Sequence, residues 1–266
     1  MKKIFYFLSL VFLCFSCSTQ LCILHLNDTH SHLEPVREEY NYGYGGIIER
    51  GAIVDSVRAS RGEKNVLLLH AGDFNQGTSY FTQMGGLLEV ETINAFRYDC
   101  ITLGNHEFDN GVEDLSSRLR MIDCPVVCAN LKLQGTALEG IVKPYTIVYR
   151  AGRKIGIIGL TSDLSSNVAY SISSQLVQYD ALDVTNRYAS YLKDELKCDM
   201  VILLSHLGFG EDEKLIPGTK DIDVVVGGHT HTKITEIHYV KNLKGRKIPI
   251  VTDECWGYSV GELIVK

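Results

Sequence analysis

Short runs of β-branched and leucine-rich residues alternate with longer amphipathic stretches after residue 20, which is the pattern of an α/β domain. The predicted strands span residues 22–26, 66–70, 100–103, 126–129, 155–159, 200–204 and 224–227. Helical periodicity covers residues 47–58, 86–96, 112–121 and 182–196. We therefore expect a sheet-based core with helices packed against it.

A hairpin pattern appears in the second half of the chain. Residues 145–149 are expected to pair with residues 154–159 across the turn at Ala151-Gly152-Arg153. Three further runs continue the hairpin pattern at residues 234–240, 248–252 and 258–265. No repeat or linker divides the chain, so residues 21–266 are predicted to form one domain.

Composition narrows the class of partner. The 266 residues are 45% hydrophobic and 22% charged, within the range of a globular domain, and the formal net charge is −6. An acidic chain is a poor ligand for a nucleic-acid backbone or an anionic lipid surface. We therefore expect no nucleic-acid partner.

Residues 1–20 are predicted to be a signal peptide and anchor segment. Lys2 and Lys3 precede an apolar run over residues 4–15, and Ser16 precedes Cys17. This arrangement resembles a bacterial lipoprotein signal, with Cys17 as the lipidated residue. The resemblance implies an exported protein anchored to a membrane, on the periplasmic side. The alternatives are ordinary secretion with cleavage nearby, or Cys14 as the modified residue.

The remaining cysteines are scattered and are expected to be core residues. Their spacing contains no CxxC pair and names no disulfide. They are Cys22, Cys100, Cys124, Cys128, Cys198 and Cys255.

Polar side chains stand directly after five of the predicted strands. They are Asp28-Thr29-His30, Gly72-Asp73, Gly104-Asn105-His106-Glu107, His206 and Gly228-His229-Thr230-His231. In an open α/β sheet, ligands bind outside the carboxyl ends of the strands, so these side chains are expected at one rim. Carboxylate, amide and imidazole donors together suit Mn, Zn or Fe better than calcium.

The spacing within these motifs fits metal binding. Asp-x-His and His-x-His place two ligands on the same side of an extended segment. Glycines at positions 72, 104, 227 and 228 let the backbone turn and approach the site closely. Each motif alone is a weak indication, but five in order at strand ends predict a metal site.

These motifs resemble those of the calcineurin-like metallophosphoesterases, in the branch of 5′-nucleotidases and UDP-sugar hydrolases. The resemblance extends over nearly all of the chain after the signal segment, and the stretch at residues 102–109 is the most specific. It implies a four-layer αββα fold, in which a two-sheet β-sandwich is flanked by helices. The motifs are Leu-Asn-Asp-Thr-His at 26–30, Gly-Asp-Phe-Asn-Gln-Gly at 72–77, Thr-Leu-Gly-Asn-His-Glu-Phe-Asp at 102–109, Ser-His-Leu-Gly at 205–208 and Gly-Gly-His-Thr-His at 227–231.

The resemblance also implies two divalent metal ions. The first would be bound by Asp28, His30 and His231, the second by Asn105, His206 and His229, and both by Asp73. His106 would be a catalytic group and not a ligand. Asp109 would orient His106 by accepting a ring proton.

The implied activity is hydrolysis of a phosphate ester, with a nucleotide as the expected substrate, as in nucleotide catabolism. Nucleotide-sugars, cyclic nucleotides and sugar phosphates are alternative substrates, and a non-catalytic surface-binding lipoprotein is the alternative outside enzymes. Members of this branch continue into a C-terminal domain that stacks the nucleoside base, whereas this sequence stops at Lys266. The expectation is that this domain is absent and that a separate polypeptide takes its place.

The other histidines and the loop tyrosines are expected to be structural. Surface exposure is the simplest interpretation for the tyrosines, although substrate contact is an alternative. These residues are His25, His32, His70 and His238, with Tyr40, Tyr42 and Tyr44.

Overall fold

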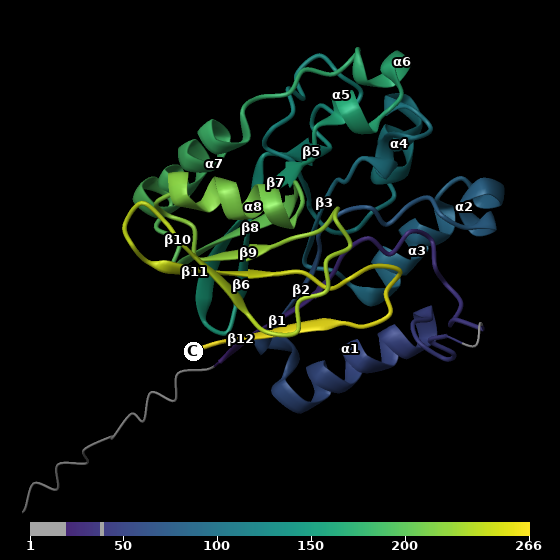
Figure 1. The fold of residues 1–266 in the computed structure, drawn as a ribbon, viewed down its shortest axis with the longest axis horizontal. Helices are drawn as coiled ribbons and strands as arrows, with labels where there is room; N and C mark the ends of the chain where they lie inside the picture. Colours follow the sequence, from purple (N-terminus) through teal and green to yellow (C-terminus); the bar gives the residue numbers. More distant parts are fainter. Residues whose placement is uncertain (1–19, 38–39) are drawn as a thin grey trace, which may run out of the picture.

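Two six-stranded sheets pack face to face, and helices cover their outer faces (Figure 1). The computed structural model describes residues 20–37 and 40–266, so Cys14 and Cys17 of the predicted signal segment lie outside the described residues. The strand orders are β12-β1-β2-β3-β4-β5 and β10-β11-β9-β8-β7-β6. The predicted two-sheet sandwich between helices is confirmed.

The first sheet contains the strands from the beginning of the chain together with the last strand. Its members are β1 (Leu21–Leu26), β2 (Val66–His70), β3 (Cys100–Thr102), β4 (Val126–Val127), β5 (Val142–Lys143) and β12 (Gly261–Val265). The helices between these strands are α1 (Ile47–Arg61), α2 (Ser79–Met84), α3 (Leu87–Phe96) and α4 (Val112–Leu119).

The second sheet is formed by the strands of the second half of the chain. They are β6 (Tyr145–Arg150), β7 (Arg153–Thr161), β8 (Met200–His206), β9 (Val224–Val226), β10 (His238–Lys241) and β11 (Lys247–Val251). Its helices are α5 (Leu164–Asn167), α6 (Tyr170–Ser173), α7 (Ala181–Ser190) and α8 (Phe209–Leu215). The helix predicted over residues 182–196 corresponds to α7, which ends at Ser190, followed by a π-helical turn over Tyr191–Glu195.

Alternating residues of each central strand pack into different layers. In β1, Leu21 and Ile23 join the cluster between the two sheets, whereas Leu24 packs on the outer side with residues of α1 and α3. In β8, Ile202 lies between the sheets and Val201 packs toward α7 and α8. Because both faces are buried, these strands are hydrophobic at nearly every position, which explains why their boundaries were readable from sequence.

The hairpin predictions are partly correct. Strands β6 and β7 pair antiparallel with Arg150 opposite Arg153, and β10 pairs antiparallel with β11. The prediction that the last strand continues this series is wrong, because β12 crosses to the other sheet and pairs with β1. Both edges of β11 are already occupied by β10 and β9, whereas the edge of β1 is available.

The described cysteines are all free and lie buried or half-buried, as expected for core residues. Within residues 20–37 and 40–266, no helix combines the length and the apolar character needed to cross a membrane.

Candidate metal centre

The carboxyl ends of parallel strands from both sheets meet at one rim. Strands β1, β2 and β3 are parallel neighbours in the first sheet, and β8 and β9 are parallel neighbours in the second. Asp28, Asp73 and Asn105 follow the first three strands, His206 ends β8, and His229 and His231 follow β9. The predicted rim is therefore built from two sheets.

The structure brings the predicted site residues together in three overlapping groups. Within each group, the ligand atoms of the side chains lie within 4.8 Å of one another. The groups are Asp28 with His30 and His231, His30 with Asp73 and His106, and Asp73 with His206 and His229. Residues from distant parts of the sequence therefore surround one small volume.

Asp73 lies between two groups of imidazoles. Its Oδ2 is 3.0 Å from His206 Nε2 and 4.0 Å from His30 Nε2. On the other side of His30, Asp28 Oδ1 is 3.5 Å from His231 Nε2. Asp73 Oδ2 therefore faces the imidazoles of both His206 and His30, and a carboxylate in this position would be able to serve two neighbouring cations.

Ring nitrogens of this group lie close to a carboxylate oxygen or to another ring nitrogen. His206 Nδ1–H donates to the Ala71 carbonyl over 2.7 Å, which directs the buried Nε2 atom toward Asp73 Oδ2, 3.0 Å away. The Nε2 atoms of His30 and His231 lie 3.0 Å apart. A divalent cation can take the place of the ring protons in these contacts, so the residues present fit a divalent metal centre.

The charges of the site also favour bound cations. Burial lowers the pKa of His206, but the charges of Asp73 and Asp28 outweigh burial and raise it to about 10. A hydrogen bond to Asp28 raises the pKa of His231 to about 10. The two buried carboxylates therefore require positive charge beside them, and divalent cations supply it in place of imidazole protons.

Asn105, His106 and Asp109 lie at the edge of this group. The Asn105 Oδ1 accepts a hydrogen bond from Ser162 Oγ over 3.4 Å, and the His106 backbone N–H donates to Asp73 Oδ1 over 2.9 Å. His106 Nδ1 lies 2.9 Å from Asp109 Oδ2, and this hydrogen bond raises the pKa of His106. The predicted pairing of His106 with Asp109 is thus present in the structure.

The ligand segments are not extended, which corrects the prediction from the Asp-x-His and His-x-His spacing. Asp28, His30, Asp73, His229 and His231 all have φ between 45° and 78°. Non-glycine residues occupy this left-handed region only where the surroundings enforce it, and such residues cluster at functional sites. The backbone turns sharply after each strand, and these turns direct the side chains inward.

Glycines permit this close approach at two positions. Gly72 has a φ of 89°, and a Cβ on it would lie 2.6 Å from the Gly104 nitrogen. A Cβ on Gly104 would lie 2.1 Å from Asp73 Oδ1 and 2.6 Å from His206 Nε2. Side chains at either position would occupy the space of the site itself, as the sequence predicted.

Glu107 has a structural role that sequence reasoning missed. Its buried carboxylate accepts four backbone N–H groups, from Gly104, Asp73, Phe74 and Asn75, at 2.6 to 3.2 Å. Burial raises the pKa of Glu107 to about 7, but four donors favour its charged form. Glu107 thereby joins the loop of Asp73 to the loop of Asn105. Its place in the specific stretch 102–109 was the available indication.

Removal of this carboxylate is expected to weaken both the fold and the metal centre. Each buried donor left unpaired costs about 1–3 kcal/mol, so Glu107→Ala should lower the melting temperature and the affinity for added Mn²⁺. Thermal unfolding with and without Mn²⁺ measures both effects. Glu113→Ala, an exposed change on α4, is the matched control. Equal melting temperatures for the two variants would contradict the role given to Glu107.

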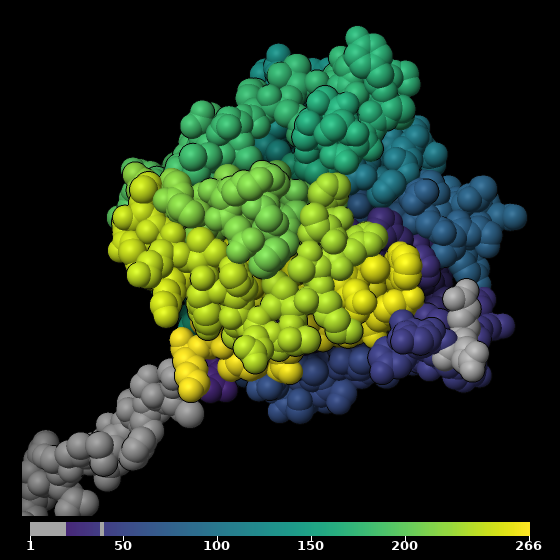
Figure 2. All heavy atoms as spheres, in the orientation of Figure 1, coloured from purple at the N-terminus to yellow at the C-terminus, as the bar shows by residue number. Residues whose placement is uncertain are grey.

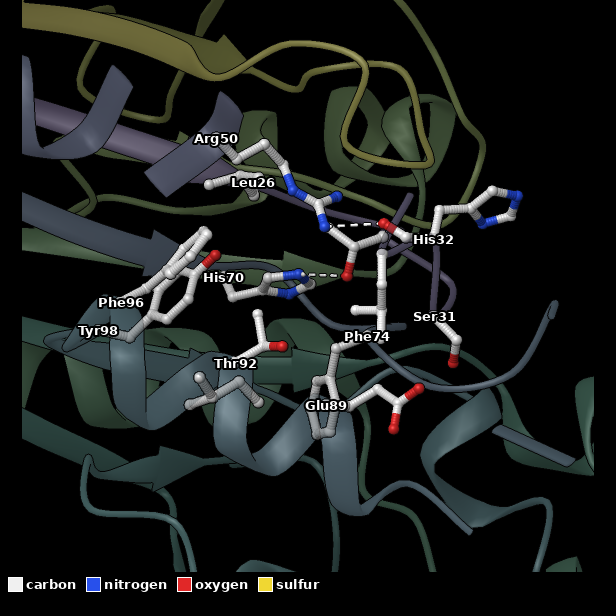
Figure 3. A pocket seen from close by; sticks show the side chains of 13 residues that line it. Leu26, Ser31, His32, Arg50, His70, Phe74, Glu89, Thr92, Phe96 and Tyr98 are labelled. Carbon is white, nitrogen blue, oxygen red and sulfur yellow. Dashed lines mark hydrogen bonds between the residues drawn. The ribbon is translucent and has the colours of Figure 1, made fainter. Parts of the chain in front are cut away.

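His70 makes hydrogen-bond contacts with the two loops that follow β1 and β2. Its Nδ1 accepts the Gly72 N–H over 3.2 Å. Its Nε2 lies 3.1 Å from Oγ1 of Thr29, the residue between the proposed ligands Asp28 and His30, and Figure 3 shows the His70 ring in this pocket. Burial lowers the pKa of His70 to about 3, so the ring is neutral. His70 therefore acts on the loops and touches none of the proposed ligand side chains at hydrogen-bond distance.

The other histidines and the loop tyrosines that were expected to be structural lie in different surroundings. His25 is buried beside Gly261, and burial lowers its pKa to about 4. His238 lies 2.8 Å from Glu213 on the surface, and His32 stacks on Trp256 at the rim. Tyr40, Tyr42 and Tyr44 are exposed and do not line the hollow that contains His30 and His106.

Comparison with known proteins agrees with this geometry. Residues 22–233 match the family described as Calcineurin-like phosphoesterase. The snake venom 5′-nucleotidase of Crotalus adamanteus is 34% identical in an alignment 270 positions long, which covers 93% of this chain and 45% of that protein.

Two solved structures are similar over most of the chain. The 5′-nucleotidase precursor from Thermus thermophilus has a TM-score of 0.86 and 35% identity, covering 93% of this chain and 51% of that one. The NAD nucleotidase of Haemophilus influenzae has a TM-score of 0.82 and 31% identity, covering 92% and 47% respectively. The chain thus spans about half the length of these relatives.

Proposed function

Because the chain belongs to the calcineurin-like phosphoesterase family, we propose that it hydrolyses phosphate esters, and nucleotides in particular, at the rim where its two sheets meet. The observation that carries this proposal is the buried pairing of His206 Nε2 with Asp73 Oδ2 across 3.0 Å, in a group with His229 where a divalent cation can replace the ring proton. The nucleotide is proposed because the similar proteins named above are nucleotidases.

The proposed ligand sets follow the clusters. Asp28, His30 and His231 would hold one ion, His206 and His229 the other, and Asp73 both. The family resemblance adds Asn105 to the second set. The mixture of oxygen and imidazole donors suits Mn, Zn or Fe. Two such ions would supply Lewis acidity toward the phosphoryl oxygens and the attacking water.

His106 and Asp109 have separate roles in this proposal. The hydrogen bond from His106 Nδ1–H to Asp109 Oδ2 fixes the orientation of the ring and favours its cationic form. His106 Nε2 is then the atom that carries a proton toward the substrate. There it stabilises the charge that develops on an oxygen of the phosphate ester, or protonates the leaving oxygen.

Product formation from a panel of phosphate esters tests this function. We expect the protein, supplied in turn with Mn²⁺, Zn²⁺, Mg²⁺ or Co²⁺, to release phosphate from AMP faster than from glucose 6-phosphate. Faster cleavage of UDP-glucose or of cyclic AMP would replace the nucleotide substrate with one of the alternative esters. Metal binding without any hydrolysis would instead indicate a non-catalytic surface protein.

We further propose that Cys17 anchors the exported protein to a membrane through lipid, on the periplasmic side. The apolar run before Ser16-Cys17 supports this proposal. Cys17→Ser is expected to move the protein from the membrane fraction to the soluble exported fraction, or to leave an uncleaved precursor, because the lipid chains supply the membrane affinity. Fractionation and intact mass measure the change. A variant with the fractionation and mass of the native protein would exclude lipidation at Cys17, and Cys14→Ser is the matched control.

A further inference from the structure

Trp256, the only tryptophan of the chain, lies at the rim of the metal centre in a strained conformation. It follows β11 and has a φ of 59°, which a bulky residue adopts only when its surroundings hold it there. Its ring centre is 6.4 Å from that of His231, a proposed metal ligand. It nevertheless keeps 37% of its surface exposed. A large aromatic side chain held rigidly beside a catalytic rim has the properties of a binding surface.

Hydrogen bonds fix Trp256 and its neighbour His32 as one unit. The two rings stack with centres 5.1 Å apart and planes 23° apart. The Trp256 backbone N–H donates to the Asp28 carbonyl over 2.6 Å. The buried guanidinium of Arg50 donates to the carbonyls of both stacked residues, to His32 over 2.8 Å and to Trp256 over 3.3 Å. The bond from Arg50 to His32 is visible in Figure 3.

The residue after Trp256 is suited to this arrangement. Gly257 has a φ of 61°, and a Cβ there would overlap the Arg50 guanidinium. The hydrogen bond from Trp256 to Asp28 joins the segment after β11 to the loop after β1. Figure 2 shows the yellow C-terminal segment beside the purple N-terminal one on the surface. The stacked pair is therefore positioned before any substrate arrives.

The stacked pair lies where two surface hollows adjoin. His32 and Trp256 line both the hollow with His30 and His106 and a neighbouring groove of about 550 Å³. The leaving group of a phosphate ester bound at the metal centre can extend into the groove beside Trp256. The neighbouring groove also contains Tyr258, whose ring centre is 5.4 Å from that of Trp256. Beside the charged Glu34 and Arg37, the groove offers the rings of Trp256 and Tyr258 to a flat, π-rich leaving group.

We propose that Trp256, backed by His32, is a stacking platform for the base of a nucleotide whose phosphate lies at the metal centre. This inference rests on the proposed function and adds the residue that selects the leaving group. Stacking of a base on an aromatic side chain is tolerant of base identity, because every base has a π face. The platform therefore selects nucleotides over aliphatic phosphate esters, and discriminates little among bases.

The tryptophan itself reports binding. Because Trp256 is the only tryptophan of the sequence, excitation at a wavelength that the 14 tyrosines do not absorb makes the fluorescence of the metal-loaded full chain a readout of Trp256 alone. Titration with adenosine is expected to give a saturable change in fluorescence, and ribose at the same concentrations is expected to give none. Equal responses to adenosine and ribose, or no response to adenosine, would overturn the platform.

Selectivity gives the second readout. For Trp256→Ala, the ratio of kcat/KM for AMP to kcat/KM for glycerol 3-phosphate is expected to fall about tenfold, in line with the loss of one stacked base. Trp256→Phe should keep most of the ratio, because it retains a ring. Tyr149→Ala, which removes an exposed aromatic residue on β6, is the matched control and should keep the wild-type ratio.

The outcomes separate this inference from the proposed function. Hydrolysis of AMP with an unchanged ratio in Trp256→Ala overturns the platform and leaves the proposed function standing. A wild-type protein that hydrolyses neither ester overturns the proposed function, and the fluorescence titration then still decides the platform. If Trp256→Ala fails to fold, the titration and Trp256→Phe decide it, since a Trp256→Phe variant without preference for AMP over the aliphatic ester would contradict stacking.

Discussion

Asp73→Ala is expected to lose metal binding and hydrolysis together. Asp73 lies between the two groups of imidazoles, 3.0 Å from His206 and 4.0 Å from His30. Without it, two cations would share no negatively charged ligand and their mutual repulsion would be unrelieved. The same change removes the acceptor of the His106 backbone N–H. Elemental analysis after dialysis and a phosphate-release assay with AMP measure the two losses.

Asp55→Ala provides the comparison for this variant. Asp55 lies exposed on α1, away from the rim, so its removal should leave the metal content and the activity of the native protein. Detection of two metal ions per chain in Asp73→Ala would contradict the assignment of Asp73 as the shared ligand. Loss of metal in both variants would point to damage to the fold.

His106→Ala is expected to keep both metals while turnover falls roughly 10²–10⁴-fold, the usual contribution of a positioned acid or base. The His106 side chain is hydrogen-bonded to Asp109, and the predicted ligands remain available when it is removed. Single-turnover kinetics with AMP, together with metal analysis of the same sample, separate the two possible roles of the residue.

Loss of metal from His106→Ala would show that His106 is a metal ligand. This alternative is tested because His106 lies in one group with His30 and Asp73. Asp109→Asn is the companion variant. Because Asp109 acts only through the imidazole, it should lower turnover less than His106→Ala does, with the metal content unchanged.

The central strands could be predicted from the sequence because they are hydrophobic at nearly every position. Strand β2 has the predicted bounds, and β8 begins at the predicted residue, because every residue in each is buried between packed layers. The site was predictable in outline for a related reason, since parallel strands ending at the same rim bring their following residues together. Asp28, Asp73 and His206 accordingly lie within one small volume.

Other features depended on contacts that no local pattern records. Strand β12 pairs with β1 across more than 230 positions of sequence, and the hairpin pattern before it gave no sign of this. The left-handed conformations of Asp28 and His229 are imposed by hydrogen bonds such as the one from the His229 N–H to Asp28 Oδ2. The role of Glu107 arises from four backbone donors in two separate loops, and that of Trp256 from Arg50, which lies 206 positions away.

A metal titration of activity tests the central claim most directly. The protein is depleted of metal with a chelator, and phosphate release from AMP is followed as Mn²⁺ is added back in known molar ratio to the chain. The account predicts no activity without metal and a rise that saturates when two ions are bound per chain. Undiminished hydrolysis by the metal-free protein, or saturation at a single bound ion, would contradict it.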